Sequence, residues 1–344
     1  MNEVLQLPVA GPAHNGASGI GLPRLGFLGL GWIGRHRLKA IAQSAAAEMA
    51  VLADPVHDAV IAGRAIAPRA MEARDLDELL DFDLDGIVIA TPSALHAEQA
   101  MAALDYGCAV FCQKPLGRTA AECRALVAKA RAVNRLLGVD LCYRHTAGMK
   151  SIRQVIRAGE LGDVYAAEMV FHNAYGPDKP WFYDARLSGG GCLIDLGTHL
   201  IDLALWCLDF PQVKRATASF HRGTAGQVED YGGAQLELET GTSVQLACSW
   251  KAPAGCEAQI GATFLGTKGG ACFRNVNGSF YDFIAERLHR NRTREVLASP
   301  PDDWGGRGIV TWANQLATAR AFDAEIETAI RTAATIDALY QSCL

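Results

Sequence analysis

The stretch Leu25-Gly26-Phe27-Leu28-Gly29-Leu30-Gly31-Trp32-Ile33-Gly34 decides the fold of the first half of the chain. Its apolar start predicts a short buried strand, and its glycines have the spacing Gly-x-Gly-x-x-Gly ahead of a predicted helix. The first glycine allows a tight turn, the second lets the backbone approach a pyrophosphate, and the third lets helix and strand pack closely. Free N–H groups at the helix start attract phosphates. The stretch therefore predicts a dinucleotide site lined by Gly29, Gly31, Trp32, Ile33 and Gly34.

A carboxylate follows the second predicted strand. The strand Ala50–Ala53 ends at Asp54, which lies 20 residues after Gly34. A carboxylate at this place accepts hydrogen bonds from the adenosine ribose hydroxyls and repels a 2'-phosphate, which favours NAD over NADP. Arg35 and Arg37 stand close enough in sequence to reach an added phosphate, so NADP stays open as an alternative.

Strand and helix patterns alternate between residues 85 and 141, which predicts a parallel sheet wound on both faces. Ligands of such sheets bind outside the carboxyl ends of the strands. His96, in the first turn of a predicted helix, either reaches this crevice or acts as a capping or surface residue. The other residues at these strand ends are Thr91, Pro92, Ser93, Gln113 and Lys114.

Lys114 has two interpretations. A compact cation at the end of the strand Cys108–Cys112 can hydrogen-bond a substrate hydroxyl and stabilise alkoxide character. A solvated lysine before a turn proline is the alternative. The Lys114–Pro115 bond is a candidate for the cis form, which sequence cannot decide.

A second chemical motif is Gly189-Gly190-Gly191-Cys192-Leu193-Ile194-Asp195-Leu196-Gly197-Thr198-His199. The glycines predict a turn that a ligand or another backbone approaches closely. The following helix, through Cys207, is apolar almost all round and is therefore expected to be buried. Asp195, His199 and Asp202 form one polar stripe on it. An imidazole held by a carboxylate is a good general base, and a satisfied core histidine is the alternative.

Residues 144–344 are expected to form a second, substrate-binding and oligomerisation domain after a first domain at residues 23–143. The alternation around Leu236, Thr240-Gly241-Thr242 and Trp250 predicts an antiparallel hairpin with one covered face. Trp181 and Tyr183 lie in an aromatic loop that either binds a sugar or covers the domain seam. Arg144, at the domain junction, is expected to bind substrate, to bind cofactor or to pack between the domains. Residues 275–307 are expected to be an exposed excursion.

Composition excludes several classes of function. The chain has 344 residues, a net charge of -5 and no basic patch interleaved with aromatic residues, which argues against nucleic acid. Its ten cysteines form no Cys-x-x-Cys and no metal-ligand cluster, so we expect no metal and a reducing, cytoplasmic setting. Residues 1–22 are expected to be a flexible tail, and the polar stripe argues against a membrane span.

Five motifs in order resemble the Gfo/Idh/MocA family (glucose–fructose oxidoreductase, inositol dehydrogenase and rhizopine catabolism). They are the glycine turn, Thr91-Pro92-Ser93-x-x-His96, Gln113-Lys114-Pro115, Tyr143-Arg144 and Gly189-Gly190-Gly191-x-x-x-Asp195-x-x-x-His199, within residues 24–265. The resemblance implies a Rossmann domain, a second α/β domain with a large, mostly antiparallel open sheet, and assembly as a homodimer or homotetramer. It implies NAD(P)-dependent oxidation or reduction of sugars and polyols.

The same resemblance assigns residue roles. Lys114, Asp195 and His199 match catalytic positions, and Thr91, Ser93, His96 and Gln113 match positions lining the cofactor cleft. The substrate is then expected at Lys114, Arg144, Trp181, Tyr183, Asp195 and His199.

One departure is Gln113, where the family usually has glutamate. An amide in place of the carboxylate removes a negative charge beside Lys114 and so favours the neutral form of the lysine amine. The alternative interpretation is that the activity is altered or lost. The leading hypothesis is a dehydrogenase acting on a secondary alcohol of a sugar, polyol or related cyclic compound. The alternatives are redox-neutral, NAD-dependent sugar elimination and a non-catalytic nucleotide-binding sensor.

Overall fold

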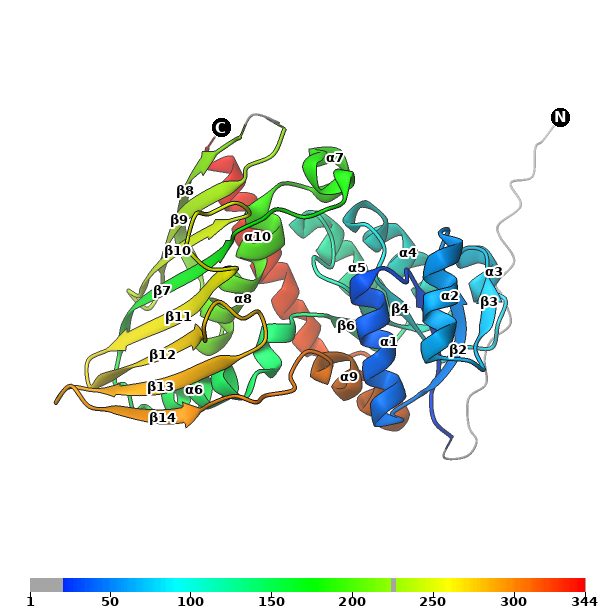
Figure 1. Ribbon diagram of the computed structural model, residues 1–344, viewed down its shortest axis with the longest axis horizontal. Helices are drawn as coiled ribbons and strands as arrows, with labels where there is room; N and C mark the ends of the chain where they lie inside the picture. Colours follow the sequence, from blue (N-terminus) through cyan, green and yellow to red (C-terminus); the bar gives the residue numbers. More distant parts are fainter. Residues whose placement is uncertain (1–20, 224–226, 344) are drawn as a thin grey trace.

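Two sheets with helices between them make up the protein (Figure 1). The computed structural model describes residues 21–223 and 227–343. The predicted tail at residues 1–22 falls almost entirely outside the described residues.

The first sheet is the parallel, doubly wound sheet that the sequence predicts. Its strand order is β3-β2-β1-β4-β5-β6 and every neighbouring pair is parallel. The order reverses direction between β1 and β4, which is the switch point where such sheets bind ligands. The elements are β1 (Arg24–Leu28), α1 (Trp32–Ser44), β2 (Glu48–Ala53), α2 (His57–Ile66), β3 (Met71–Ala73), α3 (Leu76–Leu80), β4 (Gly86–Ile89), α4 (Ser93–Asp105), β5 (Ala109–Cys112), α5 (Ala120–Ala132) and β6 (Leu137–Val139).

The second sheet has eight strands in the order β14-β13-β12-β11-β7-β10-β9-β8. All neighbours are antiparallel except β7 and β10. The predicted hairpin is confirmed, with Val244 opposite Leu236 on the covered face. The strands are β7 (Val164–Asn173), β8 (Val213–His221), β9 (Tyr231–Leu238), β10 (Ser243–Ser249), β11 (Ala258–Gly266), β12 (Gly269–Asn275), β13 (Phe283–His289) and β14 (Arg294–Ala298).

The interpretation of residues 275–307 as an exposed excursion is wrong. They contain β13 and β14, the outer hairpin of the sheet, in which Phe283 and Ala285 are buried. Edge strands commonly carry charged residues that discourage pairing with another chain. Here Arg294 pairs with Glu286 at 3.0 Å, and such charges hide the period-two pattern in the sequence.

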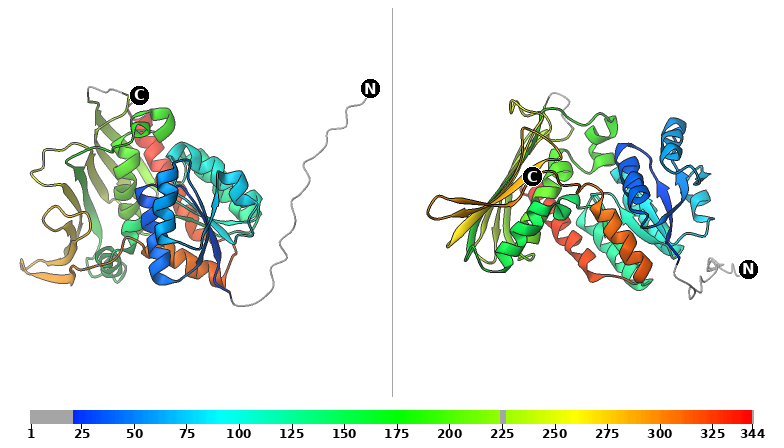
Figure 2. Two further views of the ribbon diagram at one scale, coloured as in Figure 1. Left: turned by 45° about the vertical axis from the view of Figure 1, so that its right-hand side comes forward. Right: turned by 60° about the horizontal axis from the view of Figure 1, so that its bottom comes forward.

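Three helices fill the space between the sheets: α6 (Ala147–Arg157), α8 (Thr198–Cys207) and α10 (Thr328–Gln341). They cover the inner face of the eight-stranded sheet, and among the described residues no helix covers its outer face (Figure 2). Every residue of α8 is buried, as its apolar circumference predicts. The segment Ala185–Cys207 is long and apolar enough to cross a membrane, but 94% of its apolar window is buried inside the protein, as in a core helix.

The end of the chain returns to the first sheet. Helix α9 (Arg307–Thr318) places Ile309 and Trp312 in one core with Phe27 and Phe111. Ala329 of α10 joins the core on the opposite side of that sheet. The two sheets are thus tied together by the C-terminal helices as well as by the connection that follows β6.

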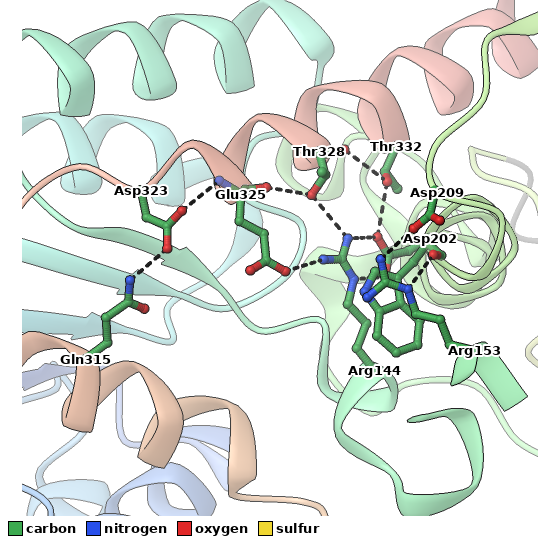
Figure 3. A network of polar contacts seen from close by, with 10 residues as sticks. Arg144, Arg153, Asp202, Asp209, Gln315, Asp323, Glu325, Thr328 and Thr332 are labelled. Atoms are coloured by element: carbon green, nitrogen blue, oxygen red, sulfur yellow. Dashed lines mark hydrogen bonds and ion pairs between the residues drawn. The ribbon is translucent and has the colours of Figure 1, made fainter. Parts of the chain in front are cut away.

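A buried ion pair joins the first sheet to α8 (Figure 3). Arg144 lies in the short helix η1 (Cys142–His145) just after β6, and its Nε and Nη2 donate to the Asp202 carboxylate over 2.7 Å and 2.5 Å. Thr332 and Thr328 of α10 add hydrogen bonds to Asp202 and Arg144. Because Arg144 is 9% exposed and Asp202 1%, each charge depends on the other for solvation.

We expect Asp202→Asn to lower the free energy of unfolding by about 3–5 kcal/mol, because it leaves the buried Arg144 guanidinium with only the exposed Glu325 carboxylate, 3.7 Å away, as an anion. The matched control is Asp209→Asn, two residues after the end of α8, where the carboxylate is half exposed and pairs with Arg153 and Arg157. That change should alter the free energy by less than about 1 kcal/mol. Urea unfolding measures both, and equal stabilities of the two variants would contradict a buried interdomain pair.

Candidate active site

The glycine turn after β1 has the geometry that a bound pyrophosphate needs. Gly29 has a φ of +91°, and a Cβ there would lie 2.6 Å from the Ala90 carbonyl. A Cβ on Gly34 would lie 2.0 Å from the Gly29 oxygen, so helix and turn touch. Gly31 has open space where a side chain would stand. Trp32 is 63% exposed and Ile33 half-buried at the start of α1, so the helix N-terminus is accessible to phosphate.

Asp54 lies beside this turn at the end of β2. Its Oδ2 accepts from the Leu30 N–H at 2.6 Å and its Oδ1 from the Val56 N–H at 2.8 Å. A carboxylate has lone pairs left for ribose hydroxyls after these two bonds. Arg37 is 3% exposed and pairs with Asp140, and Arg35 donates to the Leu30 oxygen at 2.6 Å. The residues of the turn therefore fit a dinucleotide with a free ribose.

His96 does not face the cleft as an open side chain. It is 1% exposed, and its ring nitrogens lie 2.7 Å from the Pro115 oxygen and 2.8 Å from the Thr91 oxygen. It therefore joins the loops after β4 and β5, while burial lowers its pKa. Ser93, in the first turn of α4 after Pro92, is buried, and Thr91 donates to Gln99 at 2.6 Å. Gln113 is half-buried, and its backbone N–H donates to the Ile89 carbonyl oxygen at 2.8 Å.

Lys114 and Asp195 meet across the two domains. The peptide bond between Lys114 and Pro115 is cis, the form that the sequence left undecided. The Lys114 ammonium donates to the Asp195 carboxylate Oδ1 at 2.5 Å and to the Asp195 carbonyl oxygen at 2.8 Å. The other carboxylate oxygen, Oδ2, accepts from the indole N–H of Trp250 at 2.8 Å. Lys114 is thus a paired, 13% exposed cation at the carboxyl end of the first sheet, which excludes the solvated alternative.

Asp195 sits in a single wide turn, the π-helix η3 (Leu193–Gly197), which runs directly into α8. Such π turns are frequent at functional sites. The preceding glycines make room for protein, not ligand: a Cβ on Gly190 would lie 2.0 Å from the Tyr340 hydroxyl and one on Gly191 2.0 Å from the Glu229 oxygen. The Glu229 carboxylate caps the helix by accepting from the N–H groups of Gly191 and Leu193 at 3.0 Å and 2.9 Å.

His199 is a buried imidazole with free nitrogens. It is 7% exposed, its ring packs edge-on against Tyr143 with centroids 4.9 Å apart, and within the described residues its nitrogens make no hydrogen bond. Burial holds the pKa of His199 well below its ordinary value of 6.5, and the cations of Lys114 and Arg37 lower it further. The ring is therefore neutral near pH 7 and able to accept a proton.

The polar stripe Asp195, His199 and Asp202 runs from η3 into α8, and each of its residues has different partners. Asp195 binds Lys114 and Trp250, His199 packs on Tyr143, and Asp202 binds Arg144 on the side of the domain junction. Within the described residues, no carboxylate of the stripe holds the His199 ring. The orientation of this imidazole therefore comes from aromatic packing, and Arg144 is engaged in the interdomain network of Figure 3.

The aromatic loop after β7 reaches Asp195 through Trp250. Trp181 lies in the short helix η2 (Pro180–Tyr183) and stacks on Phe182 with centroids 3.8 Å apart. The Tyr183 ring packs edge-on against Trp250 at 5.4 Å and its hydroxyl donates to the Pro177 oxygen at 3.0 Å. Both expected substrate residues are thus half-buried next to the site.

Trp250 and Glu229 were missed as site residues. Trp250 follows β10 and reads in the sequence as the last apolar residue of a hairpin. Glu229 precedes β9 in a stretch with no periodicity. A tryptophan at the end of a strand and a glutamate outside any periodic pattern are weak sequence signals for a site. The partner of Trp250 lies 55 residues away in sequence, and the partners of Glu229 lie 36 and 38 residues away.

The glycine turn with Asp54 at its side, the Lys114–Asp195 pair between the two domains and the buried imidazole of His199 define a two-domain protein with a dinucleotide-binding site. Family models match two parts of the chain: "Oxidoreductase family, NAD-binding Rossmann fold" at residues 23–141 and "GFO/IDH/MocA C-terminal domain" at residues 149–272. The chain belongs to the Gfo/Idh/MocA family, as the sequence resemblance predicted.

Known relatives and structures agree with this assignment. The chain is 31% identical to the rhizopine catabolism protein MocA of Rhizobium meliloti over 247 residues, 70% of this chain and 76% of that protein. It is 30% identical to D-glucoside 3-dehydrogenase of Escherichia coli (strain K12) over 209 residues, 56% of this chain and 60% of that protein. The fold matches KijD10, a 3-ketoreductase from Actinomadura kijaniata solved with NADP and TDP-benzene, with a TM-score of 0.82, 21% identity and coverage of 94% of this chain and 98% of that one.

We expect an NMR titration to place the pKa of His199 well below 6.5, because its ring is buried beside two cations. Lys114→Met should raise that pKa, since one cation is lost, but should leave it below 6.5 because burial persists. Lys129→Met, which removes a lysine paired with Asp105 away from the site, should leave it unchanged. A pKa at or above 6.5 in the unaltered protein would show that the imidazole is not held neutral by its surroundings.

Proposed function

We propose that the protein transfers a hydride between a nicotinamide cofactor and a secondary alcohol or ketone of a sugar, polyol or related cyclic compound. The observation that carries this proposal is the Lys114–Asp195 pair at the carboxyl end of the first sheet, together with the buried imidazole of His199, whose pKa the Lys114 cation helps to lower. An ammonium and a free base within electrostatic reach of each other suit a hydroxyl that must lose its proton. The dehydrogenase and ketoreductase names of the relatives support the same chemistry.

Each residue of the site then has one task. Hydride acceptance or donation is the chemistry that a nicotinamide cofactor supplies when bound. His199, which is neutral because its pKa is lowered, takes the proton of the substrate hydroxyl. An ammonium has three N–H donors, and Asp195 engages two of those of Lys114, which leaves one for the substrate oxygen. That N–H stabilises alkoxide character, and in ketone reduction the same groups act in reverse.

The substrate is proposed to lie between Lys114, His199 and the aromatic loop of Trp181 and Tyr183. Sugars combine hydroxyl groups with apolar ring faces, which polar groups and aromatic rings bind together. Gln113 adds no charge at this site, so Asp195 is the carboxylate that pairs with Lys114. Arg144 is given an interdomain role, because Asp202 satisfies its guanidinium.

We also propose a homodimer or homotetramer that assembles through the outer face of the eight-stranded sheet. This face carries small or polar side chains such as Ser243, Ala247 and Thr217 and is left without a helix among the described residues. A sheet face that no helix of the described residues covers can pack against the same face of a second copy in an isologous contact. A cytoplasmic location is proposed because all ten cysteines are free thiols.

We expect Lys114→Ala, Asp195→Ala and His199→Ala each to lower kcat by about 100-fold or more, because each removes a positioned polar or acid–base group. NAD affinity should stay nearly unchanged, since the phosphate turn is untouched. A screen of sugars, polyols and their keto forms, followed by NADH and NADPH absorbance, identifies the substrate, and calorimetry measures cofactor binding. Near-full turnover of His199→Ala on that substrate would make His199 a core residue only.

We expect NAD to bind more tightly than NADP, because the Asp54 carboxylate would meet a 2'-phosphate with like charge. Asp54→Ser should narrow the difference between the two dissociation constants. Asp58→Ser, which removes an exposed carboxylate from the first turn of α2, serves as the matched control and should keep the NAD preference. Calorimetric titration with both cofactors decides the matter, and equal affinities in the unaltered protein would contradict this role of Asp54.

A further inference from the structure

We propose that Trp250 is a positioning residue: its indole N–H fixes the Asp195 carboxylate so that the opposite oxygen holds the Lys114 ammonium in line with the substrate oxygen. This inference rests on the proposed function for its catalytic meaning. The contact itself is a feature of the chain that can be tested without any substrate.

Packing alone does not set the plane of a carboxylate. The terminal torsion of an aspartate side chain is broad, so the two oxygens exchange places or tilt unless donors hold them. Asp195 has two different donors, Lys114 on Oδ1 at 2.5 Å and Trp250 on Oδ2 at 2.8 Å. With both present the plane has one orientation, and without the indole only the mobile lysine constrains it.

The Trp250 indole, which donates to Asp195, is held rigidly in place. Trp250 is 1% exposed, and its backbone N–H donates to the Asp230 oxygen at 2.9 Å directly after β10. Phe182 and Tyr183 both pack edge-on against its ring, with centroids 6.3 Å and 5.4 Å away. The indole is therefore fixed by the large sheet and by the aromatic loop, whereas a lysine side chain has four rotatable carbons.

A tryptophan suits this position better than another polar aromatic residue does. An indole N–H donates and cannot accept a hydrogen bond, so it never competes with Asp195 for a proton of Lys114. A tyrosine or histidine at this position would be able to accept such a proton or change its own protonation state. The N–H also satisfies a carboxylate oxygen that is largely hidden from water, since the Asp195 side chain is 17% exposed.

Two matched tryptophan variants distinguish a positioning role of Trp250 from a role in packing alone. Trp250→Phe keeps an aromatic ring and removes the N–H donor. Trp312→Phe makes the same change in the core of the first domain, where the Trp312 ring packs against Phe111 and its indole nitrogen has no hydrogen-bond partner among the described residues. The two variants lose the same atoms, but only the first loses a hydrogen bond to a charged group.

The kinetic test compares these variants with the substrate found by the screen. We expect Trp250→Phe to lower kcat by about 10- to 100-fold, as the loss of a hydrogen bond to a charged group implies, with NAD affinity unchanged. Trp312→Phe should keep kcat within about threefold of the unaltered protein. Added to Asp195→Asn, Trp250→Phe should lower kcat by less than about threefold more, because the charged acceptor is already gone. Equal effects of the two tryptophan changes, or a full multiplicative loss in the double variant, would overturn the proposal.

A second measurement needs no substrate. The indole ¹⁵N–¹H signal that disappears in Trp250→Phe belongs to Trp250, and Asp195→Asn should shift it while leaving the Trp312 signal in place. An unmoved Trp250 signal would overturn the contact and with it the inference. If the unaltered protein turns over none of the compounds in the screen, the proposed function fails. In that case, a shift of the Trp250 indole signal in Asp195→Asn would still show the contact between Trp250 and Asp195, although the proposed function had failed.

Discussion

A half-buried ion pair between the two domains is the interaction on which the account depends. Lys114 comes from the loop after β5 and Asp195 from the turn that opens α8, and they meet at 2.5 Å. A charge in such a place is costly without a partner, so each domain is incomplete at this edge until the other supplies its half of the pair. The pair also sets the electrostatics of its surroundings, because the Lys114 cation helps to keep His199 neutral.

The rest of the structure holds the two members of this pair in place. Glu229 caps the turn that carries Asp195, and Arg144 ties the middle of α8 to the end of the first sheet. His96 joins the loop after β4 to the loop after β5, which carries Lys114. These are buried polar groups with specific partners, which give rigid positions to side chains that must meet a small substrate within a few tenths of an ångström.

The sequence predicts those elements that depend on neighbouring residues, but it does not predict contacts between residues far apart in the chain. The glycine turn, Asp54 and the alternation of strands predicted the first domain, because each depends on neighbours in sequence. The hairpin around Thr240-Gly241-Thr242 was predicted for the same reason. The β13–β14 hairpin was missed because its charges obscure the pattern, and short elements such as β3 gave too few residues to establish a period. The partners of Asp195 and Asp202, Trp250 and Arg144, lie 55 and 58 residues away, which no local pattern encodes.

The central claim is that Lys114 and His199 act on one and the same substrate oxygen. The most direct measurement is a crystal structure of the ternary complex with cofactor and the substrate that the screen identifies. The account predicts that the Lys114 ammonium and one ring nitrogen of His199 both lie about 3 Å from a single hydroxyl or carbonyl oxygen, with Asp195 still bound to Lys114 and Trp250. A substrate whose reacting oxygen contacts neither residue, or only one of them, would contradict it.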